Sequence, residues 1–312
     1  MQAASASPDD AAVAHLARTW AEHCLVKQKK APMVSSSAFD RSIPDYPLGL
    51  LPFHNHPLFE GAPEEQRQEV LTWGWIGYNL RTIGSEDRVI NPALELIAAD
   101  TFAGVDGSDY RTAIRQTMVD EHYHSLMHLQ AIERTLLQRG LTAQPKLPGS
   151  LVYRKLCEFR ENLPPWQAKL ASVTFAVVAE VSVPAYLNLI AKDATIQPEN
   201  SQLTECHNRD EYRHAKLLSQ VCRTMFVHMN AEERSCFIEY LPAALTAYVS
   251  QDVSMWAVIL QHVGIEGAEE IIEDAKVNSA TRHLVRDYRG VHGIVRDLGI
   301  AGAVQFDFSR NI

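Results

Sequence analysis

The sequence lacks the features that mark disulfide-rich, zinc-ribbon and secreted proteins. Its five cysteines are odd in number, are scattered and contain no Cys-x-x-Cys pair: Cys24, Cys157, Cys206, Cys222 and Cys236. This spacing argues against a disulfide framework or a zinc ribbon and suits a reducing compartment. The first residues, MQAASASPDD, contain no basic stretch followed by an apolar run, so we expect no secretory signal and a cytoplasmic location.

The chain also lacks an excess of positive charge and an uninterrupted apolar segment. With 38 acidic and 29 basic residues, its formal charge is −9, which argues against nucleic acid or an anionic membrane as a partner. The most apolar stretch, residues 172–191, has the length of a membrane span but carries Glu180 at its middle and Pro184 one turn later. Because a carboxylate is costly in lipid, we interpret this stretch as a buried helix of a soluble protein.

Glycine is sparse, and helical patterns dominate after residue 63. Periodicity and helix breakers predict an all-α fold, which we interpret as one helical domain over residues 1–312. Residues 31–63 are expected to form an irregular wrap or lid, and Ala303 to Ser309 a short extended piece. The expected helices are 9–26, 64–84, 86–104, 108–139, 165–191, 201–228, 231–263 and 266–288.

The motif Asp-Glu-x-x-His occurs twice, as VDEHYH and as RDEYRH. On an α-helix, residues three apart share a face, so Glu121 with His124, and Glu211 with His214, can each present an oxygen and a nitrogen to one point. A single Glu-x-x-His arises by chance roughly once in this composition, whereas Asp-Glu-x-x-His arises roughly 0.05 times. The repetition therefore indicates two halves of one metal site within a pseudo-repeated helical bundle.

A dinuclear carboxylate site in a four-helix bundle combines two such motifs with one further glutamate on each of two partner helices. Glu180 is a strong candidate, because an ionised, unpaired carboxylate in an apolar helix costs several kcal/mol and a metal removes that penalty. On the second motif helix, His207 adds an imidazole at the i, i+4, i+7 positions with Glu211 and His214.

Two residues, Glu86 and Glu95, compete for the remaining ligand position. We favour Glu86, because it precedes the first motif glutamate by 35 residues, close to the 31 residues of the second half, whereas Glu95 gives 26. Gly84 and Pro92 flank Glu86, and either could break the helix there. The sequence alone leaves both glutamates open.

The aspartates of the repeated motif, Asp120 and Asp210, have a separate expected role. A metal-bound histidine usually donates its other ring N–H to a carboxylate. Each aspartate points about 100° away from its neighbouring glutamate and could reach the histidine of the opposite helix. Four carboxylates with two or three imidazoles favour iron or manganese over structural zinc. His122 and His128 lie off the Glu121 stripe or a turn beyond it, and we do not expect them to be ligands.

This pattern resembles the ferritin-like di-iron arylamine N-oxygenases, the family typified by p-aminobenzoate N-oxygenase. The ordinary ferritin-like pattern has two histidines, and His207 looks like the third histidine that distinguishes the N-oxygenases. The resemblance runs through residues 86–214 and implies a ferritin-like four-helix bundle core with flanking helices. It also implies two iron ions, Fe2+ or Fe3+, bridged by Glu121 and Glu211. The implied ligands are Glu86, Glu121, His124, Glu180, His207, Glu211 and His214.

A member of such a family uses O2 to convert a small primary amine to a hydroxylamine, and in further rounds to nitroso or nitro products. Electrons come from a reductase or a chemical reductant, and we expect a homodimer that acts in a biosynthetic pathway. The alternatives are a C–H hydroxylase or desaturase and a non-enzymatic, iron-handling ferritin relative. Whether the amine is aromatic or aliphatic stays open. The expected pocket residues lie one or two turns from the ligands: Tyr78, Thr82, Tyr186, Leu187 and Asn188.

Overall fold

A computed structural model describes residues 8–28, 39–279 and 288–310, and the predicted all-α fold is confirmed within these ranges, which contain no strand. The α-helices are α1 (Pro8–His23), α2 (Pro57–Glu60), α3 (Glu64–Ser85), α4 (Asn91–Ala98), α5 (Ser108–Arg139), α6 (Leu151–Arg160), α7 (Pro165–Ala191), α8 (Pro198–His228), α9 (Ala231–Val249), α10 (Val253–Val263), α11 (Ala268–Ser279) and α12 (Arg289–Asp297). Four short turns complete the set: the 3-10 turns η1 (Leu25–Lys27), η2 (Leu48–Leu50) and η4 (Phe308–Arg310), and the π-helix η3 (Glu86–Ile90).

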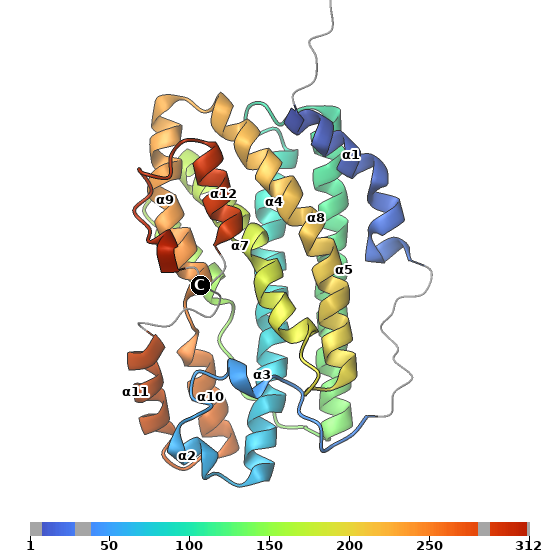
Figure 1. Cartoon of the computed structure of the whole chain (residues 1–312), viewed down its shortest axis with the longest axis vertical. Helices are drawn as coiled ribbons and strands as arrows, with labels where there is room; N and C mark the ends of the chain where they lie inside the picture. Colours follow the sequence, from blue (N-terminus) through green and yellow to red (C-terminus); the bar gives the residue numbers. More distant parts are fainter. Residues whose placement is uncertain (1–7, 29–38, 280–287, 311–312) are drawn as a thin grey trace, which may run out of the picture.

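Four long segments form the ferritin-like core of the molecule. They are a rod, in which α3, η3 and α4 follow one another end to end, and the three helices α5, α7 and α8. The rod lies beside α5, and α7 packs along α8 (Figure 1). Helix α1 lies across the outside of α5 and α8, while α6 and α9 pack on α7. At the opposite end of the bundle from α1, α10 and α11 pack near the start of α3.

The core consists of two apolar clusters separated along the bundle axis by a polar layer. On α5, for example, Ile114 belongs to one cluster and Met127 to the other, with Glu121 between them. Helix α8 repeats this order in reverse, because it runs antiparallel to α5: Leu203 precedes Glu211 and belongs to the cluster of Met127. Every predicted metal ligand lies in this layer, which is sealed at both ends by apolar side chains.

The rod of α3 and α4 continues through the residues that were expected to interrupt it. Gly84 lies inside α3, and Pro92 stands in the first turn of α4, where proline is tolerated. Between them the chain forms η3, whose wider π turn shifts the hydrogen-bond register by one residue and lets the chain pass Pro92 without ending the rod. Glu86, the first residue of η3, is buried at 4% exposure.

The apolar stretch around Glu180 forms most of α7. By length and composition, α7 and the segment of α9 and α10 are the two described stretches that could cross a membrane. The most apolar window of α7 is 83% buried inside the protein, and that of the second segment is 56% buried. The burial of α7 agrees with its interpretation as a core helix.

Several expected elements differ from the structure. Residues 231–263 form two helices, because the chain is extended at Ser250 and turns before Val253. The expected helix 86–104 ends at Ala98, after which Asp100 adopts a left-handed backbone with φ 56°. The expected extended piece in residues 303–309 was wrong, since turns and η4 occupy it.

Among the helices of more than one turn, α6 and α12 were not expected at all, and the short α2 lies within the expected irregular wrap. Helix α6 is short, and its one sequence signal is the N-cap Ser150, whose hydroxyl accepts from the backbone N–H of Tyr153. In the expected wrap, residues 29–38 lie outside the described part of the chain, and residues 39–63 are largely irregular. Tyr46 from this segment is buried against the bundle, but a lid function stays a prediction.

We predict that Gly74→Ala destabilises the fold while Gly84→Ala, in the same helix, stabilises it. A Cβ at Gly74 would lie 2.9 Å from the Trp256 ring, so the substitution overpacks a buried contact and lowers the free energy of unfolding by about 1–3 kcal/mol. At Gly84 the nearest atom is 3.4 Å away, and the helix propensity of alanine adds about 0.5–1 kcal/mol. Denaturant unfolding measures both, and equal stabilities would contradict the packing argument.

Candidate metal centre

Within the polar layer, six of the seven predicted ligands lie close together. They form two overlapping groups, and within each group one ligand atom per residue lies within 4.8 Å of all the others. The groups are Glu86, His124, His207 and Glu211, and Glu121, His124, Glu211 and His214. Each group offers two carboxylates and two imidazoles, and His124 and Glu211 belong to both. The arrangement has the donors for two metal ions side by side.

Glu180 belongs to neither group but lines the cavity beside them, at 2% exposure. Burial, together with the nearby charges of Glu211 and Glu121, raises the pKa of Glu180 well above its ordinary value. Its Oε2 atom, like that of Glu211, is buried and has no hydrogen-bond partner among the described residues. A buried carboxylate oxygen in this state is costly unless it is protonated or faces a cation. These orphaned oxygens fit a metal pair.

The structure separates the two glutamates that the sequence left open. The Glu86 Oε1 atom lies 3.3 Å from His207 Nε2, and Ser125 Oγ donates to Glu86 Oε2 at 3.2 Å. Burial raises the pKa of Glu86 well above its ordinary value. The Glu95 side chain is 53% exposed and pairs with Arg115 at 2.5 Å. Glu86 therefore faces the cluster and Glu95 does not, although the ligand role of Glu86 stays a prediction.

Two of the histidines bring their Nδ1 atoms to the cluster and their Nε2 atoms to an aspartate of the opposite helix. The His124 Nδ1 atom lies 3.3 Å from Glu121 Oε2, and its Nε2 lies 3.2 Å from Asp210 Oδ2. The His214 Nδ1 atom lies 2.7 Å from Glu121 Oε1, and its Nε2 lies 3.3 Å from Asp120 Oδ2. Burial lowers the pKa of a histidine, but the surrounding carboxylates outweigh it and raise the pKa of both rings.

Both aspartates are held in turn by the N-terminal part of the chain. The Trp20 indole donates from Nε1 to Asp120 Oδ2 at 2.7 Å, and the Leu25 backbone N–H donates to Asp210 Oδ2 at 3.3 Å. On the same side, Arg213 Nη2 of α8 donates to a backbone carbonyl of α1 at 3.1 Å. These contacts join residues about 100 and 185 positions apart, so no local sequence pattern indicated them.

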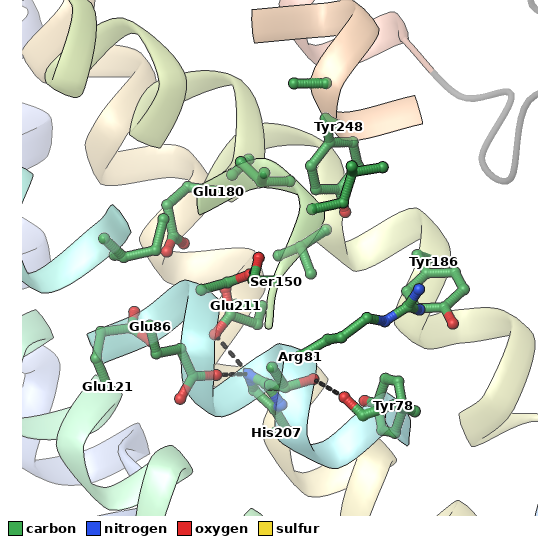
Figure 2. Close-up of a pocket in the computed structure, with 18 of the residues that line it drawn as sticks. Tyr78, Arg81, Glu86, Glu121, Ser150, Glu180, Tyr186, His207, Glu211 and Tyr248 are labelled. Atoms are coloured by element: carbon green, nitrogen blue, oxygen red, sulfur yellow. Dashed lines mark hydrogen bonds and ion pairs between the residues drawn. The ribbon is translucent and has the colours of Figure 1, made fainter. Parts of the chain in front are cut away.

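The third histidine is oriented differently. The His207 Nε2 atom lies 2.9 Å from Glu211 Oε1 and faces the cluster, while its Nδ1 lies 2.8 Å from Nε2 of His128 (Figure 2 shows His207 beside Glu86 and Glu211). The other ring nitrogen of His128 lies 2.6 Å from Asn79 Oδ1. Burial and the neighbouring imidazoles lower the pKa of His128 well below its ordinary value. The sequence pattern did not indicate this contact.

A cavity of about 120 Å³ adjoins the cluster, between walls from α3, η3, α5, α6, α7, α8 and α9. Of the expected pocket residues, Tyr78, Thr82 and Tyr186 line it, and Leu187 and Asn188 do not. Leu187 packs in an apolar cluster, and Asn188 hydrogen-bonds to side chains of α8. Helix α7 continues past Pro184 as a helix, so it presents only one of its three expected positions to the cavity.

Among the lining residues that were not expected there are Arg81, Ser150 and Tyr248 (Figure 2). Arg81 is the one arginine or lysine among the lining residues, and its guanidinium points toward Tyr186. Its spacing of three residues from Tyr78 places both side chains on one face of α3. The wall thus combines acidic groups at one side with an aromatic and cationic region at the other.

Comparison with known proteins identifies two extensive similarities. A family model described as p-aminobenzoate N-oxygenase AurF matches residues 7–299. A 4-aminobenzoate N-oxygenase of Streptomyces thioluteus is 38% identical over 299 residues, which cover 96% of this chain and 89% of that protein. Both similarities extend well beyond the repeated motifs, and the family match includes α1 as well as the four central segments.

We predict that Trp20→Phe weakens the fold through Asp120. The substitution removes the indole donor, so the free energy of unfolding should fall by about 1–2 kcal/mol, toward the lower part of the range for bonds to charged groups because Trp20 is half-buried. As a control, Trp166→Phe at the 38% exposed start of α7 should change stability by less than about 0.5 kcal/mol. Denaturant unfolding compares them, and equal losses would contradict a specific role of the indole N–H.

Proposed function

Since this chain belongs to the p-aminobenzoate N-oxygenase family, and is accordingly an N-oxygenase and an oxidoreductase, we propose that its polar layer binds two iron ions that use O2 to oxidise an aromatic amine. The observation that carries the iron assignment is the pair of overlapping ligand groups, which together offer carboxylate and imidazole donors and no thiolate. The family similarity favours oxidation at nitrogen over the alternative of a C–H hydroxylase or desaturase.

The net reaction shows which reactants, electrons and protons the site requires. One round converts R–NH2, O2, two electrons and two protons to R–NHOH and water, so a donor outside the chain must supply the electrons. The bound metals would supply the redox chemistry that the reduction of O2 requires. Further rounds on the same nitrogen lead to nitroso and nitro products. The proposal retains a reductase or chemical reductant as donor, together with a homodimer and a cytoplasmic location.

The two motif glutamates are the residues that would contact both metal ions. Glu121 turns one carboxylate oxygen toward His124 and the other toward His214. The Glu211 Oε1 atom lies 2.9 Å from His207 Nε2, 3.3 Å from His124 Nδ1 and 3.4 Å from His214 Nδ1. Histidine partners outweigh burial and hold the pKa of both glutamates below the ordinary value, so both are ionised at neutral pH. Two ionised carboxylates that lie between three imidazoles are suited to binding by two neighbouring metal ions.

The cavity supports a compact aromatic substrate that carries an acidic group. Its volume of about 120 Å³ is close to the roughly 150 Å³ of a cavity known to accept benzene. Arg81 can form a bidentate pair with a carboxylate, and arginine stays charged at any relevant pH. We place the carboxylate of a 4-aminobenzoate-like amine at Arg81, with the ring against Tyr78 and Tyr186 and the amine toward the glutamates.

A titration with iron and an isotope experiment test the reaction. We expect the wild-type chain to bind two Fe(II) per chain without O2 and, with 18O2 and a reductant, to place 18O on the nitrogen of 4-aminobenzoate. His207→Ala should lose most N-oxygenation, whereas His122→Ala, at an exposed position of α5, should retain it. Fewer than two irons in the wild type would contradict the proposal, and full activity of His207→Ala with two irons would exclude the role of His207.

A second experiment tests the placement of the substrate. Arg81→Leu should lower kcat/KM for 4-aminobenzoate by about 30- to 150-fold, the equivalent of one lost charge-assisted hydrogen bond of about 2–3 kcal/mol. Aniline, which has no carboxylate, should lose little. The control Arg88→Leu removes an exposed arginine of η3 and should leave both substrates unaffected. Equal losses for the two substrates in Arg81→Leu would contradict a carboxylate at Arg81.

A further inference from the structure

The three histidines of the cluster do not have equivalent partners. His124 and His214 present Nδ1 to the cluster and rest their Nε2 atoms on aspartates. His207 is reversed: it presents Nε2 to the cluster and rests its Nδ1 on another imidazole, His128, at 2.8 Å. An imidazole, unlike a carboxylate, can be either donor or acceptor. The contact alone therefore does not determine which of the two histidines donates the hydrogen, unless other contacts determine the tautomer of His128.

A backbone carbonyl fixes the direction of this contact. The Trp75 carbonyl oxygen can only accept, and Asn79 Nδ2 donates to it at 2.7 Å, which turns Asn79 Oδ1 toward His128. Because Oδ1 also can only accept, the hydrogen between it and His128 Nδ1, 2.6 Å apart, belongs to His128. The four residues are buried at 0–1% exposure, so water does not offer alternative partners.

This hydrogen on His128 Nδ1 determines which atom donates in the hydrogen bond between His128 and His207. A neutral His128 with its hydrogen on Nδ1 has a bare Nε2, which accepts from the Nδ1–H of His207. The Nε2 lone pair of His207 is then directed at Glu211 and Glu86, where a metal would lie. In the reverse order His207 would carry its hydrogen on Nε2 and could not bind a metal. Only one direction of the chain of hydrogen bonds is compatible with ligation.

We propose that His128 is a positioning residue, which with Asn79 and the Trp75 carbonyl forms a directed chain of hydrogen bonds that holds His207 in its metal-binding tautomer. This inference rests on the proposed metal pair. It also distinguishes the histidines chemically: a carboxylate partner raises the basicity of a ligand imidazole, whereas a neutral imidazole partner does so less. His207 is thus the most weakly donating of the three.

Two substitutions at position 128 separate a directed chain from simple packing. His128→Phe keeps a planar ring but has no acceptor for His207 Nδ1–H. His128→Gln is not an imidazole and does not titrate, yet its amide oxygen can accept from His207 while its NH2 donates to Asn79 Oδ1, in the same order. The control, His122→Phe, changes an exposed histidine two residues before the ligand His124.

The test is anaerobic titration of each folded variant with Fe(II) and with Co(II) alone, the visible Co(II) spectrum reporting the ligand set. We expect about 10- to 100-fold weaker binding at one of two sites and an altered spectrum in His128→Phe, the usual cost of losing the partner of a ligand histidine. His128→Gln should bind within about threefold of wild type with the wild-type spectrum, and His122→Phe should match wild type.

Each other outcome has a defined meaning. Wild-type affinity and spectrum in His128→Phe would overturn the proposal, and so would a His128→Gln protein that binds as weakly as the phenylalanine variant. If circular dichroism shows that His128→Phe is unfolded, the glutamine variant decides alone, because restored binding requires the directed chain. A wild-type protein that binds fewer than two ions would instead refute the proposed metal pair, and with it the metal-binding tautomer assigned to His207.

Discussion

The burial of four glutamates in one layer of the bundle is the constraint that organises the molecule. Removal of each ionised carboxylate from water costs several kcal/mol, and the layer also contains two aspartates, so repulsion adds to that cost. Three imidazoles and their hydrogen bonds offset part of it, and bound cations at the orphaned oxygens of Glu180 and Glu211 would offset the rest. The apolar clusters above and below the layer supply the stability that keeps so polar a centre closed.

The parts of the site that depend on helix register could be predicted from the sequence. The i, i+3 and i+4 spacings place the motif residues on one face, and the cross-helix contacts of Asp120 and Asp210 are set by the same geometry. The choice of Glu86 rested only on spacing along the chain, because the π turn that orients it has no sequence signature. Trp20, Arg81 and His128 could not be assigned, since their roles arise from approaches between helices that tertiary packing decides.

The two halves of the bundle also diverge more than their motifs suggest. His207 stands four residues before the glutamate of the second motif, and His128 four residues after the histidine of the first, so each half contributes one member of the histidine pair. The positions related to them by the pseudo-symmetry are Thr117 and Leu218, both buried. One side of the centre therefore has a linked pair of imidazoles, and the other has a small hydroxyl and an aliphatic side chain.

The π-helix η3 has a consequence at the level of the gene. A π turn contains one residue more than the α turn it replaces, and its wider turn absorbs that residue, which in a regular α-helix would rotate the two flanking segments by about 100° relative to each other. Here it lets α4 keep its apolar contacts with α5 and α7 while Glu86 faces the polar layer. The loss of a single codon within η3 would therefore leave a regular helix with the same apolar contacts, without the π turn in which Glu86 now lies.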